Sequence, residues 1–331
     1  MKIGEDKNIS NKEIFSKTFG FSVRRFFFDI LAFVAMGGLA AAGFFIAEKQ
    51  FDEGLIGLLI GLVVGLILVA IVLRYVSYSY KAGQIAMMTE GITKGELPDN
   101  VIKAGKKVVK ERFATVAAFF AVTGIIKGIF NEIGRAITNV GEKVGGDAGS
   151  TVGSAVSTVI RVIVSYLCDC CLGWVFYRKD QKAARATCEG AVLFFKHGKT
   201  FAKNMGRVFG MGLVSLLLIG GVFGGILYFV GMQFPAFFTQ VAEAIREAAV
   251  ESQKAIPEFF MTAQGATAVA AGLGGLIFWN IIHGAFVRPF VLTGVLRNYL
   301  NAGMQDVPSE SSFALLDSKS KKFKKLHGEL A

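Results

Sequence analysis

The sequence predicts an all-α polytopic membrane protein with six transmembrane helices, accompanied by amphipathic interfacial helices on the cytoplasmic and outer sides. Of its 331 residues, 53% are hydrophobic and only 18% are charged, and the mean hydropathy is +0.52. Soluble domains carry about 25% charged residues, so this composition belongs to a different class of protein. Several apolar stretches are long enough to cross about 30 Å of hydrocarbon as helices. Basic residues also gather in alternate connections between those stretches, which is typical of a chain that crosses a bilayer repeatedly.

Six apolar stretches qualify as spans because each approaches the roughly 20 residues that a transmembrane helix needs. They cover residues 26–47, 55–73, 113–130, 157–177, 208–231 and 267–287. A polar N-terminal segment, 1–25, precedes the first span, whereas the apolar core of a signal peptide is shorter and lies near the terminus. We therefore expect the first span to be retained and the transmembrane domain to extend over 26–300.

Glycine accounts for 40 residues and recurs on single helix faces. Gly57, Gly61 and Gly65 follow one another every four residues in the second span, as Gly220 and Gly224 do in the fifth. Small residues let helix backbones approach closely in lipid, where apolar attraction between helices is absent. These faces predict close packing within the bundle, and a homo-oligomer formed through the same faces is the alternative.

The distribution of charge predicts the orientation. Residues 1–25, 74–112, 178–207 and 288–331 together hold 29 Lys or Arg and 13 Asp or Glu. The opposite connections, 48–54, 131–156 and 232–266, hold five basic and ten acidic residues. Because basic connections stay in the cytoplasm, both termini are predicted to be cytoplasmic. The isoelectric point near 9.5 then reflects orientation and attraction to an anionic inner leaflet rather than binding of nucleic acid.

Two cytoplasmic connections have the pattern of basic amphipathic helices, with apolar residues alternating with lysines over 101–110 and 192–207. Each basic side chain near an anionic surface contributes about 1 kcal/mol, so we expect both helices to lie on the inner leaflet. The outer connections predict interfacial helices around 133–144 and 237–256, and the composition of 301–331 predicts a disordered basic tail. The side chains predicted to contact the lipid surface are Lys103, Lys106, Lys107, Lys110, Lys196, Lys199 and Lys203.

Polar side chains inside the spans are the candidates for a binding site. Asp169 lies about 12 Å from the inner end of the fourth span, too deep for its short side chain to reach water. An ionised carboxylate there costs roughly 3 kcal/mol or more, so it should face the bundle interior, a cavity or a partner. Asn280 and His283 share a face of the sixth span, and Trp174 and Trp279 lie on the same two spans. An acid with aromatic faces suits an organic cation. The alternative is a structural hydrogen-bond network, with the tryptophans as interface anchors.

Other kinds of site lack the residues that they require. A structural zinc site typically needs two Cys pairs, whereas this chain has one cluster, Cys168, Cys170 and Cys171, followed by Cys188. The three histidines are too far apart in sequence for an HExxH motif or a histidine cluster. We therefore predict no enzyme activity, no catalytic residue, no cofactor and no metal.

From the fourth span onward, the chain resembles the C-terminal half of the choline-transporter-like family of multi-pass proteins. That family has a Cys-rich inner end of a span, then a stretch with Cys and Ala before Phe/Leu pairs, then a basic-Asn-x-x-Arg-Val element. A His-Gly-x-Phe-like element follows in its last span. The corresponding residues here are Cys168–Cys171, Cys188 with 191–195, 203–208 and 283–286. Members of the family are longer and carry a large extracellular domain after the first span, where this chain has only 48–54. The overall plan is also similar to uncharacterised prokaryotic six-span proteins, including membrane domains attached to some glycerophosphodiester phosphodiesterases.

Two functions are therefore expected. The leading hypothesis is a small transporter or permease for an organic cation or a lipid-headgroup-like solute. In it, Asp169 supplies the counter-charge, Asn280 and His283 the polar lining, and Trp174 and Trp279 the aromatic walls. The alternative is a non-transporting membrane protein whose basic helices bind anionic lipid and shape or scaffold the bilayer.

Overall fold

A computed structural model describes residues 9–145, 149–253, 255–318 and 320–329, and these residues form helices and turns without a strand. The side chains of 133–145, 149–161 and 198–205 lie outside the description, as do those of single residues at 77, 116, 195, 310, 311 and 315. The chain divides into two compact units. Unit 1 comprises 1–24, 76–208 and 289–331, and unit 2 comprises 25–75 and 209–288.

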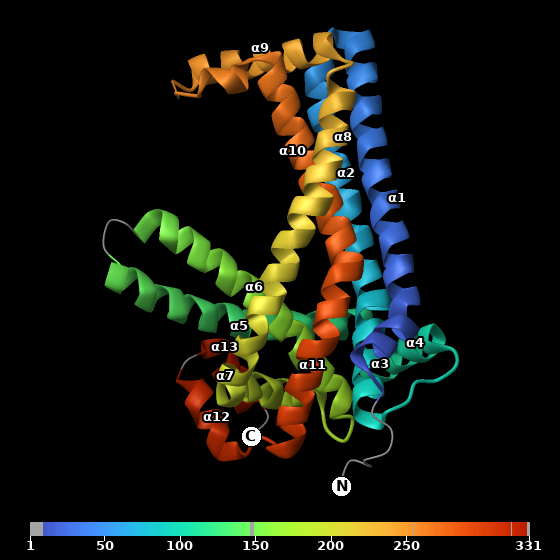
Figure 1. Ribbon diagram of the computed structural model, residues 1–331, viewed down its shortest axis with the longest axis vertical. Coiled ribbons are helices and arrows are strands. Elements are labelled where there is room, and N and C mark those ends of the chain that lie inside the picture. The colour runs from blue at the N-terminus through green and yellow to red at the C-terminus, as the bar shows by residue number, and fades with distance from the viewer. Residues whose placement is uncertain (1–8, 146–148, 254, 319, 330–331) are drawn as a thin grey trace. The chain divides into compact units, whose positions relative to one another are not determined.

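Unit 2 consists of long apolar helices. It contains most of α1 (Asn11–Phe51), α2 (Gly54–Val76), the end of α7 (Ala183–Ser215), η3 (Leu216–Gly220), α8 (Gly221–Gly231), α9 (Pro235–Glu251), η4 (Glu258–Met261), α10 (Ala263–Ile282) and η5 (His283–Val287). The segments η3 and η5 are π-helical, which is a rare geometry that inserts a wider turn into an α-helix. Figure 1 shows α9 lying across the end of α8 and α10. The helix α9 includes most of the residues of the interfacial helix predicted around 237–256. Its Ala242 and Ala249 are buried, and its Glu243 and Glu247 are exposed.

Four helices in the described part of the chain are long and apolar enough to cross a membrane, and they coincide with four of the six predicted spans. They extend over Asn11–Phe51, Gly54–Lys94, Gly206–Gly231 and Ala263–Gln305. Between 6% and 28% of the residues in their most apolar windows are buried, so most of their apolar surface is left for lipid or a partner. The chain therefore has the character of an integral membrane protein.

The predicted spans 113–130 and 157–177 fall on α5 (Val116–Gly145) and α6 (Gly149–Tyr177), which belong to unit 1. The described part of α5 meets α4 (Val101–Arg112) at a bend of 81°, and the two would count as a fifth span only if taken together. The described apolar part of α6, Val162–Tyr177, is shorter than a span, and its C-terminal half is buried in the core of unit 1. Hydropathy alone does not distinguish a buried core helix from a short span, so the count of six stays a prediction.

Glycine packs α1 against α2 in unit 2. A Cβ atom added to Gly57 would lie 2.1 Å from the carbonyl oxygen of Gly43, and one added to Gly61 would lie 2.2 Å from that of Leu39. Backbones at this separation exclude any side chain, which is the close approach that the glycine spacing predicts. The two helices run antiparallel and are joined by a tight turn in which Asp52 has a φ of 58°.

The helix α10 contacts both α1 and α8. The ring of Phe278 stacks on Phe223 of α8 at 4.6 Å and meets Phe33 of α1 edge-on at 5.2 Å. The part of α1 that begins unit 2 lies beside η5, which follows α10, because the ring centroids of Phe26 and Phe286 are 5.3 Å apart. Since α2 is antiparallel to α1 and α8 to α10, all four chain connections that leave unit 2 do so at the same end of it.

Unit 1 is a helical domain with its own core. Besides α4, α5 and α6 it contains the start of α1, η1 (Ser77–Lys81), α3 (Ala82–Lys94), α7 as far as Val208, α11 (Arg288–Gln305), α12 (Glu310–Asp317) and α13 (Lys321–Gly328). In the C-terminal half of α6, Cys171, Trp174 and Val175 are wholly buried, as are Leu296 and Tyr299 of α11. This burial on all sides makes α6 the central helix of the domain.

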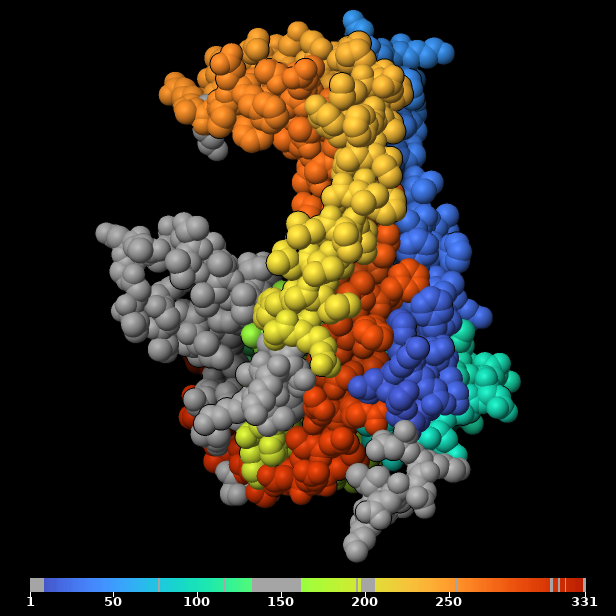
Figure 2. Space-filling model, in the orientation of Figure 1, coloured from blue at the N-terminus to red at the C-terminus, as the bar shows by residue number. Residues whose placement is uncertain are grey.

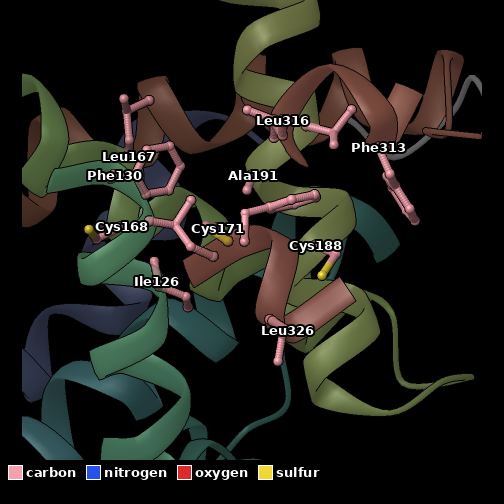
Figure 3. Packing of buried hydrophobic residues seen from close by; sticks show 13 residues of the cluster. Ile126, Phe130, Leu167, Cys168, Cys171, Cys188, Ala191, Phe313, Leu316 and Leu326 are labelled. Carbon is pink, nitrogen blue, oxygen red and sulfur yellow. The ribbon is translucent and has the colours of Figure 1, made fainter. Parts of the chain in front are cut away.

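The C-terminal residues do not form the disordered tail predicted for 301–331, because α12 and α13 fold back onto the core of unit 1. Phe313, Leu316, Phe323 and Leu326 are buried in a cluster that also holds Ile126, Phe130, Leu167 and three cysteines (Figure 3). The hydroxyl of Ser320 donates to Glu132 Oε2 at 2.6 Å and thereby fastens the start of α13 to α5. The lysines of α13 lower its average hydropathy, but its two apolar residues lie three apart and share one face, which is enough to bury them.

Candidate functional site

The five residues predicted to bind a solute do not lie in one unit. Asp169 and Trp174 belong to unit 1, whereas Trp279, Asn280 and His283 belong to unit 2.

Asp169 is buried in α6 and has a cationic partner from the same unit. Its Oδ1 atom lies 2.7 Å from the ammonium nitrogen of Lys81, and its side chain is only 6% exposed. Lys81 is the last residue of the π-helical η1 and stands 88 positions earlier in the chain. Asp169, the predicted counter-charge for an organic cation, is thus already paired with the positive charge of Lys81. The sequence alone did not single out this lysine.

Trp174 is completely enclosed and belongs to a network of charged groups. Its indole Nε1 donates to Glu189 Oε2 at 3.0 Å, and Arg178 donates to the same oxygen at 3.0 Å. Arg178 also donates to both carboxylate oxygens of Asp180 at 2.9 Å. These hydrogen bonds lower the pKa of Asp180 and raise the pKa of Arg178, because they favour the charged form of each group.

Arg112 extends this network to the end of α4. It donates to the carbonyl oxygens of Gln181 at 2.7 Å and Arg178 at 3.0 Å, and burial lowers its pKa. The network therefore holds α4 to the turn between α6 and α7. Glu189, Arg178 and Arg112 were not among the predicted site residues, although Glu189 is conspicuous as the acid in an otherwise small and apolar stretch, 186–195.

In unit 2, Trp279 and His283 meet at Ser215, the last residue before the π-helical η3. The Ser215 hydroxyl accepts from Trp279 Nε1 at 3.0 Å, lies 2.9 Å from His283 Nδ1, and donates to the carbonyl of Gly212 at 2.9 Å. The indole and imidazole rings are 5.1 Å apart. Asn280 is exposed instead, so the structure brings together two of the three predicted residues and adds Ser215.

The contact between Ser215 and His283 Nδ1 is compatible with either tautomer of the imidazole, because the hydroxyl can donate to the ring nitrogen or accept from it.

Two further polar residues of unit 2, Arg25 and Asp29, stand on one face of α1 next to η5. Arg25 donates to the carbonyl oxygen of Gly284 at 3.0 Å, and its Nε lies 3.6 Å from Asp29 Oδ2. Asp29 is only 8% exposed. These residues bring a second polar group to the π-helical turn that begins with His283.

The lysines of α4 form a row on the surface of unit 1. Lys103, Lys106, Lys107 and Lys110 are all exposed, and Figure 2 shows the helix in blue-green on the surface of the molecule. The opposite face packs on protein, because Val109 is buried and a Cβ at Gly105 would meet Phe21, Gly83 and Met87. The apolar side of this helix thus packs partly against α3 and the start of α1, whereas the lysines and Glu111 are exposed. The predicted position of the helix on the inner leaflet stays a prediction.

The second predicted lysine row lies on α7. Lys196 is paired at 2.7 Å with Asp306, the residue that directly follows α11, while the side chains of Lys199 and Lys203 lie outside the described residues. The helix changes direction at His197, where φ is −113° and ψ is 18°. A continuous amphipathic helix over 192–207, as predicted, is thus interrupted after its first turn.

Within the described residues, no group of three or more His, Cys, Asp or Glu side chains is arranged to hold a metal ion. The four cysteines are free thiols and buried. A shallow pocket of about 320 Å³ lies at the start of α4, lined by Lys17, Gly20, Asp99, Asn100, Val101 and Ile102. There the Asn100 side chain accepts from the backbone nitrogen of Lys103 at 3.0 Å and caps the helix.

Comparison of the chain with protein-family models, with curated proteins and with solved structures finds no match. The resemblance to the choline-transporter-like family therefore stays a prediction from the motifs quoted above.

Proposed function

We propose that this integral membrane protein binds anionic lipid headgroups at one face of the bilayer through the exposed lysines of α4. The proposal rests on the difference between the two faces of this helix. Its apolar side packs against α3 and Phe21, whereas its four lysines are exposed on the opposite side. Lys106 also lies over the ring of Tyr80, and Lys107 lies 3.8 Å from Glu111. Such a row is suited to electrostatic attraction by phosphate-bearing headgroups, each lysine contributing about 1 kcal/mol near an anionic surface.

Connectivity and charge support this proposal. With four spanning helices, the segments of unit 1 all emerge on the same side of the bilayer, since the chain leaves unit 2 at a single end. Those segments hold 30 Lys or Arg residues and 17 Asp or Glu residues. The connections at the opposite end, 48–54 and 232–262, hold three basic and seven acidic residues. This asymmetry favours a cytoplasmic location for unit 1, where the leaflet is anionic.

Replacing the four lysines of the α4 row with glutamine should weaken binding of an anionic lipid by about tenfold or more, because each substitution removes up to about 1 kcal/mol of attraction. The measurement is a titration of the full-length protein in maltoside micelles with short-chain phosphatidylglycerol. Raising the salt concentration should weaken binding to the wild-type protein more than to the variant, since exposed charges are screened.

The matched control removes the same charge from exposed lysines elsewhere in unit 1, namely Lys12, Lys94, Lys179 and Lys182. Its affinity should stay within a few-fold of the wild-type value. Equal losses in the two variants would mean that net charge, and not the row on α4, governs the interaction.

Transport of an organic cation is the second candidate function, and the Ser215, Trp279 and His283 group favours it. An indole ring beside an imidazole, inside otherwise apolar helices, can offer an aromatic face and a polar edge to a cation. Uptake of radiolabelled choline into proteoliposomes should fall by about tenfold or more in His283→Ala and Asp169→Asn, and stay unchanged in Gly272→Ala, whose Cβ meets no neighbour. No flux in the wild type would eliminate transport, and equal flux in all four proteins would eliminate His283 and Asp169 as residues on which transport depends.

A further inference from the structure

Asp29 is a buried carboxylate with an incomplete set of partners. It lies in the apolar part of α1, 8% exposed, and its Oδ1 atom is enclosed and makes no hydrogen bond. Its other oxygen, Oδ2, is 3.6 Å from Arg25 Nε, which is longer than a hydrogen bond. An ionised carboxylate that is removed from water in this way is poorly compensated.

Arg25 directs its better hydrogen bond elsewhere. Its terminal nitrogen donates to the carbonyl oxygen of Gly284 at 3.0 Å, so the guanidinium bridges α1 and the π-helical η5. A Cβ atom on Gly284 would lie 3.3 Å from this guanidinium, which shows how closely the side chain approaches the turn. Arg25 is therefore divided between an acid on its own helix and a carbonyl on the neighbouring one.

The enclosed oxygen of Asp29 restricts what can bind there. An atom that is sealed from solvent cannot receive a metal ion, an amine or a headgroup without separating α1 from the helices beside it. A proton needs no such space, and it removes the charge whose burial is unfavourable. We propose that Asp29 is a proton-binding site within unit 2, and that its protonation releases Arg25 from the carboxylate while the hydrogen bond from Arg25 to η5 stays in place.

The charged and titratable groups at this end of unit 2 are Arg25 on α1, Arg74 on α2, and His283 and Arg288 on η5 and α11. The arginines favour the ionised form of Asp29, and burial opposes it. Of these groups, only Arg25 is in salt-bridge range of Asp29 among the contacts in the described residues. Arg25 is therefore the charged group whose removal should change the balance between the two forms.

The position of this pair couples protonation to helix packing. Two adjacent residues of η5 are each tied to a different helix: the His283 side chain to Ser215 of α7, and the Gly284 carbonyl to Arg25 of α1. Wider π-helical turns often occur where a helix is adjusted for function. Protonation of Asp29 would remove its attraction for Arg25, so that the Gly284 carbonyl no longer shares the guanidinium with an acid on α1.

Infrared difference spectroscopy of the full-length protein in nanodiscs, recorded while the pH is stepped down and back, tests the proposal. The wild-type protein should show a carbonyl band of a protonated carboxylic acid that appears reversibly, and Asp29→Asn should lack it. Asp169→Asn, the matched control at the other buried aspartate, should keep the band. Arg25→Gln should move its midpoint to higher pH by at least about one unit, a tenfold increase in proton affinity.

A band that persists in Asp29→Asn, or a wild-type spectrum without any such band over the pH range in which the protein stays folded, would overturn the proposal. An unshifted midpoint in Arg25→Gln would also contradict it. If Asp29→Asn does not fold, Asp29→Glu provides the same test, because a glutamic acid carbonyl absorbs at a different frequency and the band must move with the substitution. Lipid binding by α4 is measured separately, so this result and the proposed function can fail independently.

Discussion

Replacing Lys81 with methionine is expected to destabilise the protein by about 3 kcal/mol, because it leaves Asp169 buried in α6 without the ammonium group that lies 2.7 Å away. Removing one member of a buried ion pair costs more than removing both, since the remaining charge keeps its desolvation penalty. The double variant Lys81→Met with Asp169→Leu should therefore recover much of the lost stability. Thermal and chemical unfolding in micelles, followed by tryptophan fluorescence, measures both effects. With Trp279 replaced by phenylalanine, the buried Trp174 of unit 1 is the only reporter.

The control for this experiment is Lys94→Met. Lys94 pairs with Glu90 on the surface of α3, where its side chain is 59% exposed, so its loss should cost less than about 1 kcal/mol. A comparably small effect of Lys81→Met would mean that Asp169 does not depend on its lysine. That outcome would strengthen the transport hypothesis, in which this carboxylate is available to an external cation.

Replacing Gly57 with leucine is expected to disrupt the α1–α2 hairpin, with a loss of about 3 kcal/mol or more. The Cβ atom would lie 2.1 Å from the backbone oxygen of Gly43, and backbone cannot move aside as the end of a flexible side chain can. The helices must therefore separate, and close packing is what associates them in lipid. Circular dichroism during titration with a denaturing detergent should show the midpoint falling.

Gly38→Leu is the matched control for Gly57→Leu. Gly38 also lies in the spanning part of the hairpin, on α1, but a Cβ there meets no atom within 4 Å. Its unfolding midpoint should stay close to that of the wild-type protein. If both leucine variants unfold at the same midpoint, the close approach at Gly43 and Gly57 does not stabilise the hairpin.

Much of unit 2 follows from local features of the sequence. The charge-free second span and its glycines at 57, 61 and 65 predict an apolar helix with one small-residue face, and α2 presents that face to α1. The lysines of α4 alternate with apolar residues, which predicts that they share an exposed face, and they do. Such features can be predicted from the sequence because helix periodicity places residues three and four positions apart on the same side of the helix.

The candidate site could be predicted only in part. Asp169, Trp174, Trp279 and His283 attract attention because polar or aromatic groups in apolar helices need partners. Of their actual partners, Glu189 is marked only by its apolar surroundings, and Lys81 and Ser215 are as ordinary in sequence as any other lysine or serine. Trp279 and Ser215 are separated by 64 positions, and Arg25 and Gly284 by 259. No periodicity connects residues at such separations, so nothing local identified these pairs.

The sequence by itself determined that this chain is helical, apolar enough for a membrane and basic on alternate connections, because composition and short-range spacing suffice for those properties. Only the tertiary structure decided that α6 and the C-terminal helices join a separate core, and which groups neutralise the buried acids. An apolar helix is equally stable against lipid and against other apolar helices, so hydropathy leaves its surroundings open. The packing of distant segments makes that choice, and with it the partner of a buried charge such as Asp169.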